Sequence, residues 1–437
     1  MSAATPGEEA RQGAIVRAPQ LLLGLFALSL PLANPSVPLL GYRVIAADFL
    51  FVALAAAWAA TLAAGRTRFI WDRSYLLIAA YFAAVAASAV ASEAPRTSAA
   101  KMLTQLYLVA LPVLAINLVR DTAGLKALLR WWLAGTAIVA LVAAASLLLF
   151  LAAPESPLLA YSRFHLGTLP PGDYPRLRMT FANANMACNY LSVSLAMLLA
   201  ARRLGWLGRS SFLWLVAGVL LAAAFTISPG LGGIALVIGL WLWLTLRQRA
   251  LARLALAAGA GAALLFLLAA AVTPYLHPTA PFLIELPLVE ATIAPSGRLM
   301  LWIDAVRAFA ADPLLGRGIG VYPVLVQYLS PSGHLQTLAD AHNSFLNIAA
   351  QAGIVGLAAL LALTVHVMRR AGPLRLAPDG ANALRLALGL GFLSAFVYQG
   401  LTGSFEDARH LWLLVGLIAA ADRIERDRAI APPPSAA

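Results

Sequence analysis

The feature that most constrains this fold is a series of apolar segments, each long enough or nearly long enough to cross a lipid bilayer as a helix. Twelve of them lie at residues 20–33, 44–64, 74–92, 102–119, 131–152, 181–201, 211–227, 231–246, 254–273, 343–368, 384–403 and 409–422. A transmembrane helix needs ~20 predominantly apolar residues. Because 61% of the residues are hydrophobic and only 11% are charged, the chain has too few polar groups to cover a soluble globule. We therefore predict an all-α polytopic membrane protein with about 12 transmembrane helices in a single domain over residues 1–437.

The distribution of positive charge predicts which way these helices run. If the N-terminus is cytoplasmic, the inner loops hold 21 of the 31 Lys and Arg residues, as the positive-inside rule requires. Both termini are therefore expected in the cytoplasm. The net charge of +12 does not indicate a nucleic-acid partner, because the basic residues are spread through short loops and form no patch with interleaved aromatic residues.

The longest connection follows the ninth apolar segment, over residues 274–341, and faces outside in this orientation. A loop of that length is too long to be a simple connector. Arg298 begins a stretch with helical spacing, RLMLWIDAVRAF, and the glycine-rich stretch GRGIG follows at 316–320. We predict a helix that starts near Arg298. Arg307 and Arg317 fit equally well as solvated or lipid-facing charges of an amphipathic interfacial helix.

The tenth apolar segment is preceded by the polar sequence ADAHN at residues 339–343. Asp340 fits an N-cap, which would place His342 and Asn343 in the first turn of a helix at the outer membrane surface. The partial positive charge of a helix N-terminus disfavours imidazolium, so His342 is expected to be neutral and able to accept a proton. The same helix end would offer free backbone N–H groups to an anion. We therefore predict a catalytic or substrate-binding role for His342.

This helix should also pack within a bundle. Below His342 its face carries the small residues Gly353 and Gly356, which let a neighbouring helix approach closely. A second stripe, N-x3-N-x3-Q from Asn343, is polar and is expected to face protein because lipid would penalise it.

These residues carry a resemblance to a known family. His342-Asn343, nine residues, Gly353, two residues and Gly356 fit the pattern H-N-x9-G-x-x-G, and the chain resembles the O-antigen ligase family of the WaaL type. It is also similar to the wider group of Wzy-type polymerases and protein O-oligosaccharyltransferases. The similarity extends to SGRLMLWIDAVRAFAADPLLGRGIG at 296–320, MTFANANMACNYL at 179–191 and FEDARHLW at 405–412, and so covers roughly the second half of the chain.

The resemblance implies a GT-C-like membrane enzyme of the bacterial inner membrane, with residues 274–341 as a large periplasmic loop between helices 9 and 10 that carries part of the active site. It implies glycosyl transfer without metal or cofactor, from a glycan linked through diphosphate to undecaprenol. For a ligase the acceptor is lipid A-core, and membrane lipids surround the protein. The energy is already stored in the donor, and no G-x-x-x-x-G-K-[ST] nucleotide loop occurs in the sequence.

Carried over residue by residue, the resemblance implies that His342 is the general base and that Arg298 binds the diphosphate. Many relatives place a second arginine in a turn that here reads TISPGLGG, with Pro229 at that point. The second cation would then be Arg176 or Arg178. Arg178 is preferred because it adjoins the TFANAN segment, although both arginines also fit as topogenic or interfacial charges.

Further polar residues complete the expected site. Asn183, Asn185 and Asn343 are candidates for binding sugar hydroxyl groups, although capping of the sixth helix explains at least one of the first two equally well.

The carboxylates Glu406 and Asp407 are expected either to orient His342, to pair with Arg409 or to lie in a solvated acidic loop.

Two other functions fit the sequence. A Wzy-type polymerase would use the same donor with a second lipid-linked repeat as acceptor, and the motif does not separate it from a ligase. A transporter or flippase is the alternative from another class, but its usual long central cytoplasmic connection is reduced here to about residues 202–210.

Overall fold

The structure is a computed structural model and describes residues 6–39, 42–163, 175–276, 284–286, 291–293, 298–324, 326–329, 335–372 and 382–430. Its α-helices are α1 (Pro6–Ser29), α2 (Ala46–Ala63), α3 (Ser74–Val90), α4 (Pro95–Leu118), α5 (Thr122–Ala152), α6 (Ala184–Arg203), α7 (Arg209–Ala224), α8 (Leu231–Trp241), α9 (Arg249–Leu276), α10 (Arg298–Ala311), α11 (Ser344–Arg370), α12 (Ala383–Phe392) and α13 (Arg409–Ile430). Short helical turns are η1 (Pro157–Tyr161), η2 (Leu242–Leu246), η4 (Leu393–Tyr398) and η5 (Gln399–Leu401).

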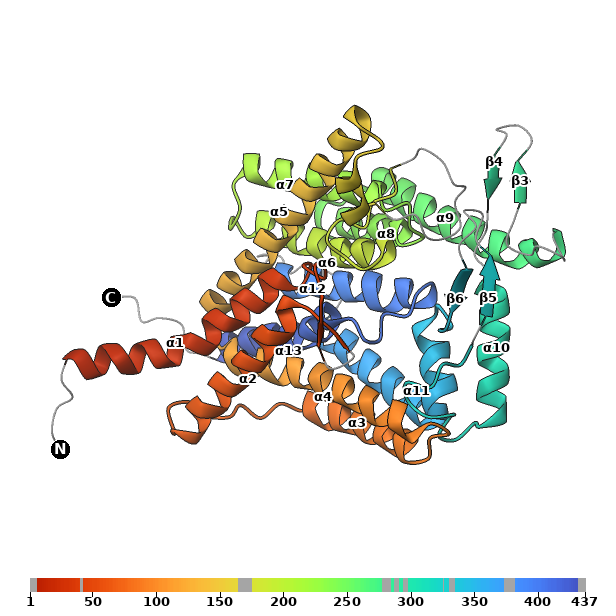
Figure 1. The fold of residues 1–437 in the computed structure, drawn as a ribbon. Coiled ribbons are helices and arrows are strands. Elements are labelled where there is room, and N and C mark those ends of the chain that lie inside the picture. The colour runs from red at the N-terminus through yellow and green to blue at the C-terminus, as the bar shows by residue number, and fades with distance from the viewer. Residues whose placement is uncertain are drawn as a thin grey trace.

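In the part of the chain that the structure describes, three small pairs of antiparallel strands join the helices, and the sequence did not predict them. They pair β1 (Val37–Leu39) with β2 (Tyr42–Val44), β3 (Ile284–Leu286) with β4 (Ala291–Ile293), and β5 (Val326–Leu329) with β6 (Leu335–Leu338). The last two hairpins lie with α10 in the long connection between α9 and α11. In Figure 1 this group of elements stands at the right of the molecule, far from the start of α1 at the left.

The helices confirm an all-α polytopic membrane protein. All twelve apolar segments of the sequence overlap helices. Among the described residues, seven helices are long and apolar enough to cross a membrane, and four further apolar helices are shorter. The number of twelve membrane crossings stays a prediction.

Outward-facing leucines mark the surface that meets lipid. Leu141, Leu148 and Leu151 of α5 are 70%, 68% and 72% exposed, and their spacing puts them on one helical face. Leu264 and Leu265 of α9 are exposed in the same way. A soluble protein rarely exposes such contiguous apolar surface, so these faces fit a bilayer.

The core is built around α6, whose side chains are almost all buried. Its polar groups are satisfied internally: Asn189 donates to the carbonyl of Ala395 at 2.7 Å, and Ser194 accepts a hydrogen bond from the indole of Trp132 at 3.0 Å. The Trp132 ring also stacks on Tyr190, with 5.2 Å between ring centroids. These contacts attach η4 and α5 to the central helix α6.

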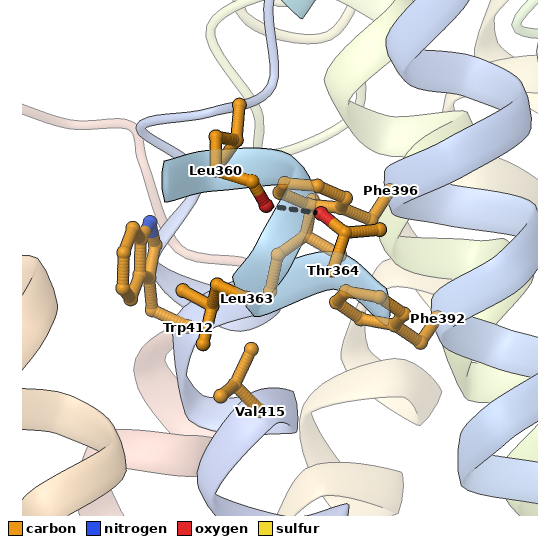
Figure 2. Close-up of a pocket in the computed structure, with 8 residues that line it drawn as sticks. Leu360, Leu363, Thr364, Phe392, Phe396, Trp412 and Val415 are labelled. Atoms are coloured by element: carbon orange, nitrogen blue, oxygen red, sulfur yellow. Dashed lines mark hydrogen bonds between the residues drawn. The ribbon is translucent and has the colours of Figure 1, made fainter. Parts of the chain in front are cut away.

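Helices α11, α12 and α13 close against each other with little space left between them. The gap between them has a volume of ≈ 10 Å³, and Figure 2 shows side chains that line it, such as Leu360, Phe392 and Trp412. The hydroxyl of Thr364, which lines the gap, donates to the carbonyl of Leu360 at 2.8 Å. A gap of this size holds at most about one water, so it is a packing defect of the core and not a substrate site.

Candidate active site

Helix α11 starts two residues after the histidine predicted to be catalytic. Its N-cap is Asn343, whose side-chain oxygen accepts from the backbone N–H groups of Phe345 at 3.0 Å and Leu346 at 3.1 Å. The prediction that Asp340 caps the helix and that His342 lies in its first turn is therefore wrong. An asparagine in the extended conformation is as good a cap as an aspartate, and it stands immediately before the apolar run.

His342 lies in a strained backbone conformation just outside the helix. Its φ of 46° is in the left-handed region, which non-glycine residues seldom adopt and which costs energy. The strain turns the imidazole back onto Asp340, and Nδ1 of His342 donates to Oδ1 of this carboxylate. The same Oδ1 accepts from the backbone N–H of His342 at 2.7 Å and from the hydroxyl of Ser404 at 3.0 Å.

Asp340 is thereby the residue that fixes the histidine ring. Burial opposes its ionisation, but the hydrogen bonds from His342 outweigh burial and hold the pKa of Asp340 at about 2. An ionised carboxylate on Nδ1 selects the tautomer in which Nε2 is the proton acceptor. Asp340 was predicted only as a helix cap. The D-x-H spacing was the available signal for this pair, and it was masked by the capping interpretation.

The start of α11 does not offer its N–H groups to an anion as predicted. Two of them bind the Asn343 side chain, and the N–H of Ser344 donates to the carbonyl of Gly403 at 3.1 Å. The hydroxyl of Ser344 donates to the same carbonyl at 3.0 Å. These contacts attach the helix end to the loop before α13, so any anion must be bound by side chains.

Arg298 begins α10, as predicted, and its side chain is buried. The residue is 5% exposed, its guanidinium carbon lies 4.6 Å from the ring centroid of Phe266, and its Nε has no hydrogen-bond partner among the described residues. Burial first, and then the positive charge of Arg176, lower the pKa of Arg298 to about 10, while Asp340 acts in the opposite direction. Arg298 stays protonated at neutral pH, within electrostatic reach of both residues.

One face of α10 is buried and consists of Arg298, Leu301, Ala305 and Ala308, while Trp302 and Phe309 are only partly covered. Arg307 is exposed and pairs with Asp304 at 3.1 Å, which fits the solvated interpretation of this arginine.

Arg317 forms an ion pair with Glu93 at 2.8 Å. This contact joins the GRGIG loop to the turn between α3 and α4.

The structure brings Arg176, and not Arg178, toward Arg298. Arg176 is 6% exposed, and its Nε donates to the carbonyl of Thr226 at 3.2 Å. Thr226 is the first residue of TISPGLGG, so Arg176 reaches the turn in which many relatives carry an arginine and this chain has Pro229. Arg178 points elsewhere and donates to the carbonyl of Ala160 at 3.1 Å.

The two asparagines at the start of α6 have different surroundings. Asn183 is its N-cap and accepts from the N–H of Met186 at 2.7 Å, as the capping interpretation predicts. Asn185 accepts from the hydroxyl of Ser228 at 2.8 Å and so lies beside the Pro229 turn. Of the two, Asn185 shares the turn that Arg176 reaches.

Glu406 and Asp407 do not contact His342. Glu406 accepts from the Asn347 side chain, and Asp407 pairs with Lys101 and accepts from Gln105 at 2.8 Å. The alternatives that the two carboxylates orient His342 or pair with Arg409 are therefore wrong.

Arg409 pairs with Asp48 of α2 at 2.7 Å instead.

A break in α11 holds the arginine helix in place. Gly353 has φ 63° and ψ −165°, which interrupts the helix, and the chain after α10 fills the gap. The N–H of Ile354 donates to the carbonyl of Pro313 at 2.8 Å, and the N–H of Gly318 donates to the carbonyl of Gln351 at 3.0 Å. Gly353 thus allows the chain after α10 to insert into α11. The predicted close approach of another helix below His342 is not the main role of this glycine.

Within the described ranges, no group of three or more His, Cys, Asp or Glu side chains is placed to hold a metal ion. The site instead combines a histidine fixed by a carboxylate with two buried arginines. Such a set can remove a proton and can bind a group of high negative charge.

Comparisons with known proteins bear on this site. A search of curated proteins found no match to the chain. The model of the O-antigen ligase family matches residues 210–361, a segment that runs from α7 into α11 and contains Arg298, His342, Gly353 and Gly356. The resemblance predicted from the histidine motif is therefore confirmed over residues 210–361, which match the O-antigen ligase family.

Proposed function

We propose that this protein is an O-antigen ligase that transfers a glycan from undecaprenyl diphosphate to lipid A-core on the periplasmic side of the bacterial inner membrane. The observation that carries the proposal is the His342–Asp340 pair within electrostatic reach of the buried Arg298, which is itself within electrostatic reach of the buried Arg176. A general base and a diphosphate site are the two groups that this reaction requires.

His342 acts as the general base. The acceptor hydroxyl gives its proton to Nε2 of His342, and its oxygen forms the new bond to the reducing-end carbon of the glycan. The bond between that carbon and the diphosphate oxygen breaks, and the diphosphate leaves with the electron pair. Asp340 stabilises the imidazolium that forms, as a carboxylate on Nδ1 does in hydrolase triads.

Arg298 and Arg176 bind the diphosphate. Two buried guanidinium groups that repel each other are stabilised when an anion binds between them. Their attraction to the leaving group increases as the glycosidic bond breaks. The two arginines therefore stabilise the transition state more than the bound substrate, and this lowers the barrier to transfer. Arg176 supplies the cation that many relatives place near Pro229, and its contact with Thr226 in that turn supports this assignment.

The remaining polar candidates have secondary roles in this proposal. Asn185 binds a sugar hydroxyl beside the Pro229 turn, where it contacts Ser228. Asn183 and Asn343 use their side-chain oxygens as helix caps and shape the site through the backbone. Arg178 contacts the substrate at the edge of the site, where its guanidinium group lies near the protein surface beside Ala160.

The test is a transfer assay with purified protein in detergent. Lipid-linked glycan together with lipid A-core should give glycosylated lipid A-core. The donor incubated alone should not be elongated. Elongation of the donor alone would instead identify a polymerase, and no transfer with either acceptor would favour a transporter. His342→Ala and Arg298→Ala should abolish transfer while the proteins still elute as folded species.

A further inference from the structure

A second polar cavity adjoins the proposed catalytic pair. It has a volume of ≈ 310 Å³ and lies between α4, α11, the loop after α10 and the loops that precede α11 and α13. Asp340, which holds His342, forms part of its wall. Neither Arg298 nor Arg176 lines it. The cavity therefore reaches Asp340, the partner of the proposed base, without including the arginines of the proposed diphosphate site.

One wall of this cavity holds a buried acid whose hydrogen bonding is incomplete. Glu406 is 4% exposed, and its Oε1 accepts from Asn347, but its Oε2 has no partner among the described residues. A buried carboxylate oxygen without a partner is costly. A hydroxyl group bound in the cavity would satisfy it.

The chemistry of the lining favours an uncharged, hydroxyl-rich ligand. The wall combines the carboxylates Asp340, Glu406 and Asp407 with only one ammonium group, Lys101, so a diphosphate would be repelled. Amides and hydroxyl groups supply further donors and acceptors. Tyr322 is 63% exposed and presents its ring at the cavity. Carboxylates, amides and an open aromatic ring together suit a sugar.

We propose that this cavity binds the terminal sugar of the acceptor and presents its hydroxyl group to His342. The inference rests on the proposed transfer reaction and adds to it the place of the second substrate. A volume of ≈ 310 Å³ is at the lower end of the ~300–1,000 Å³ of ligand pockets, which suits one or two sugar units and excludes the lipid part. The donor then occupies the arginine side, so the two substrates meet at His342.

The test uses Tyr322→Ala and Thr104→Val, because both residues line the cavity and Tyr322 is too exposed for its loss to unfold the protein. Each variant should raise the KM for lipid A-core, Tyr322→Ala by about tenfold, which corresponds to 1.4 kcal/mol. The KM for the lipid-linked donor and kcat should change by less than about twofold. Tyr161→Ala is the matched control, because Tyr161 is equally open at 72% exposure but lies outside the cavity.

A binding measurement separates this inference from the proposed function. Lipid-free core oligosaccharide should give saturation-transfer NMR signals with the wild-type protein and with Tyr161→Ala, and weaker signals with Tyr322→Ala. An unchanged acceptor KM, or a rise in the donor KM of equal size, would overturn the cavity assignment while transfer itself stands. If the wild-type protein transfers nothing, the proposed function fails. If Tyr322→Ala also leaves the binding of the oligosaccharide unchanged, the cavity assignment fails as well.

Discussion

At the residue scale, the chemistry depends on how one imidazole ring is held. Nδ1 of His342 faces an ionised Asp340, so Nε2 is the nitrogen that remains for a substrate. The left-handed φ of His342 is the cost of this orientation, and backbone strain of this kind is common where a side chain must be aimed. The pair therefore behaves as a unit, and either member should be needed for proton transfer.

This unit predicts the effect of Asp340→Asn. The amide can accept through oxygen or donate through nitrogen, so it no longer selects one tautomer or stabilises imidazolium. We expect kcat for glycan transfer to fall by about 10²-fold to 10⁴-fold, the range that a general base contributes, with the KM for the donor little changed. Asp304→Asn is the control, because this carboxylate pairs with the exposed Arg307 on α10. A kcat for Asp340→Asn equal to that of the control would contradict the dyad.

Glu406 predicts a pH dependence of stability. Burial first, and then the nearby charge of Asp407, raise the pKa of Glu406 from 4.5 to about 7 in the folded protein. The folded state thus binds this proton more tightly than the unfolded state, so stability falls as pH rises from about 4.5 to about 7, and above that the whole cost is present. Glu406→Gln lacks the titration. The melting temperature of Glu406→Gln relative to that of the wild type should therefore rise between pH 5 and pH 8. A difference between the two melting temperatures that stays constant with pH would exclude this role.

At the element scale, the break in α11 ties the arginine helix to the histidine loop. Gly353 accepts a backbone conformation that other residues avoid, and a Cβ at this position would lie 2.1 Å from the carbonyl oxygen of Leu314. The chain after α10 could not then dock into the break. The distance between Arg298 and His342 is therefore set by packing far from either side chain.

Gly353→Ala should consequently destabilise the protein and disturb the site. We expect a loss of about 2–4 kcal/mol, because a strained φ and a backbone clash are combined, seen as a lower melting temperature of purified protein and reduced transfer. Gly261→Ala in α9 provides the comparison, since no atom lies within 4 Å of its added Cβ and alanine favours a helix by about 0.5–1 kcal/mol. Equal melting temperatures for the two variants would refute the importance of the break.

The same elements show how far a sequence can predict a site. The positions of His342 and Arg298 followed from local patterns, because a polar group at the end of an apolar run and a helical period are visible in a few residues. Arg298 and Arg176 are more than a hundred positions apart in the sequence, and the partners of Glu406 lie on other helices. No local pattern could therefore predict that these residues come together. Gly353 was predicted in a helix because its spacing is helical, whereas the docked loop overrides that spacing.

At the scale of the whole molecule, hydropathy predicted more than any other signal. Every apolar segment overlaps a helix, because a chain in lipid must satisfy its backbone hydrogen bonds within the segment itself. Hydropathy alone did not predict the hairpins of the long loop or the central position of α6. Those depend on packing between segments, and a single sequence does not record which helices meet.

Orientation in the membrane is the property on which the proposed reaction depends as a whole. Tyr322 and Ala64 are both exposed and lie, by the positive-inside prediction, on opposite sides of the membrane. Tyr322→Cys in cells with a permeabilised outer membrane should react with a membrane-impermeant maleimide, while Ala64→Cys should react only after the inner membrane is opened. The unaltered protein is the blank, because its single cysteine, Cys188, is fully buried. The reverse labelling pattern would put the arginines and His342 in the cytoplasm, away from a periplasmic donor and acceptor, and would rule out the proposed ligase.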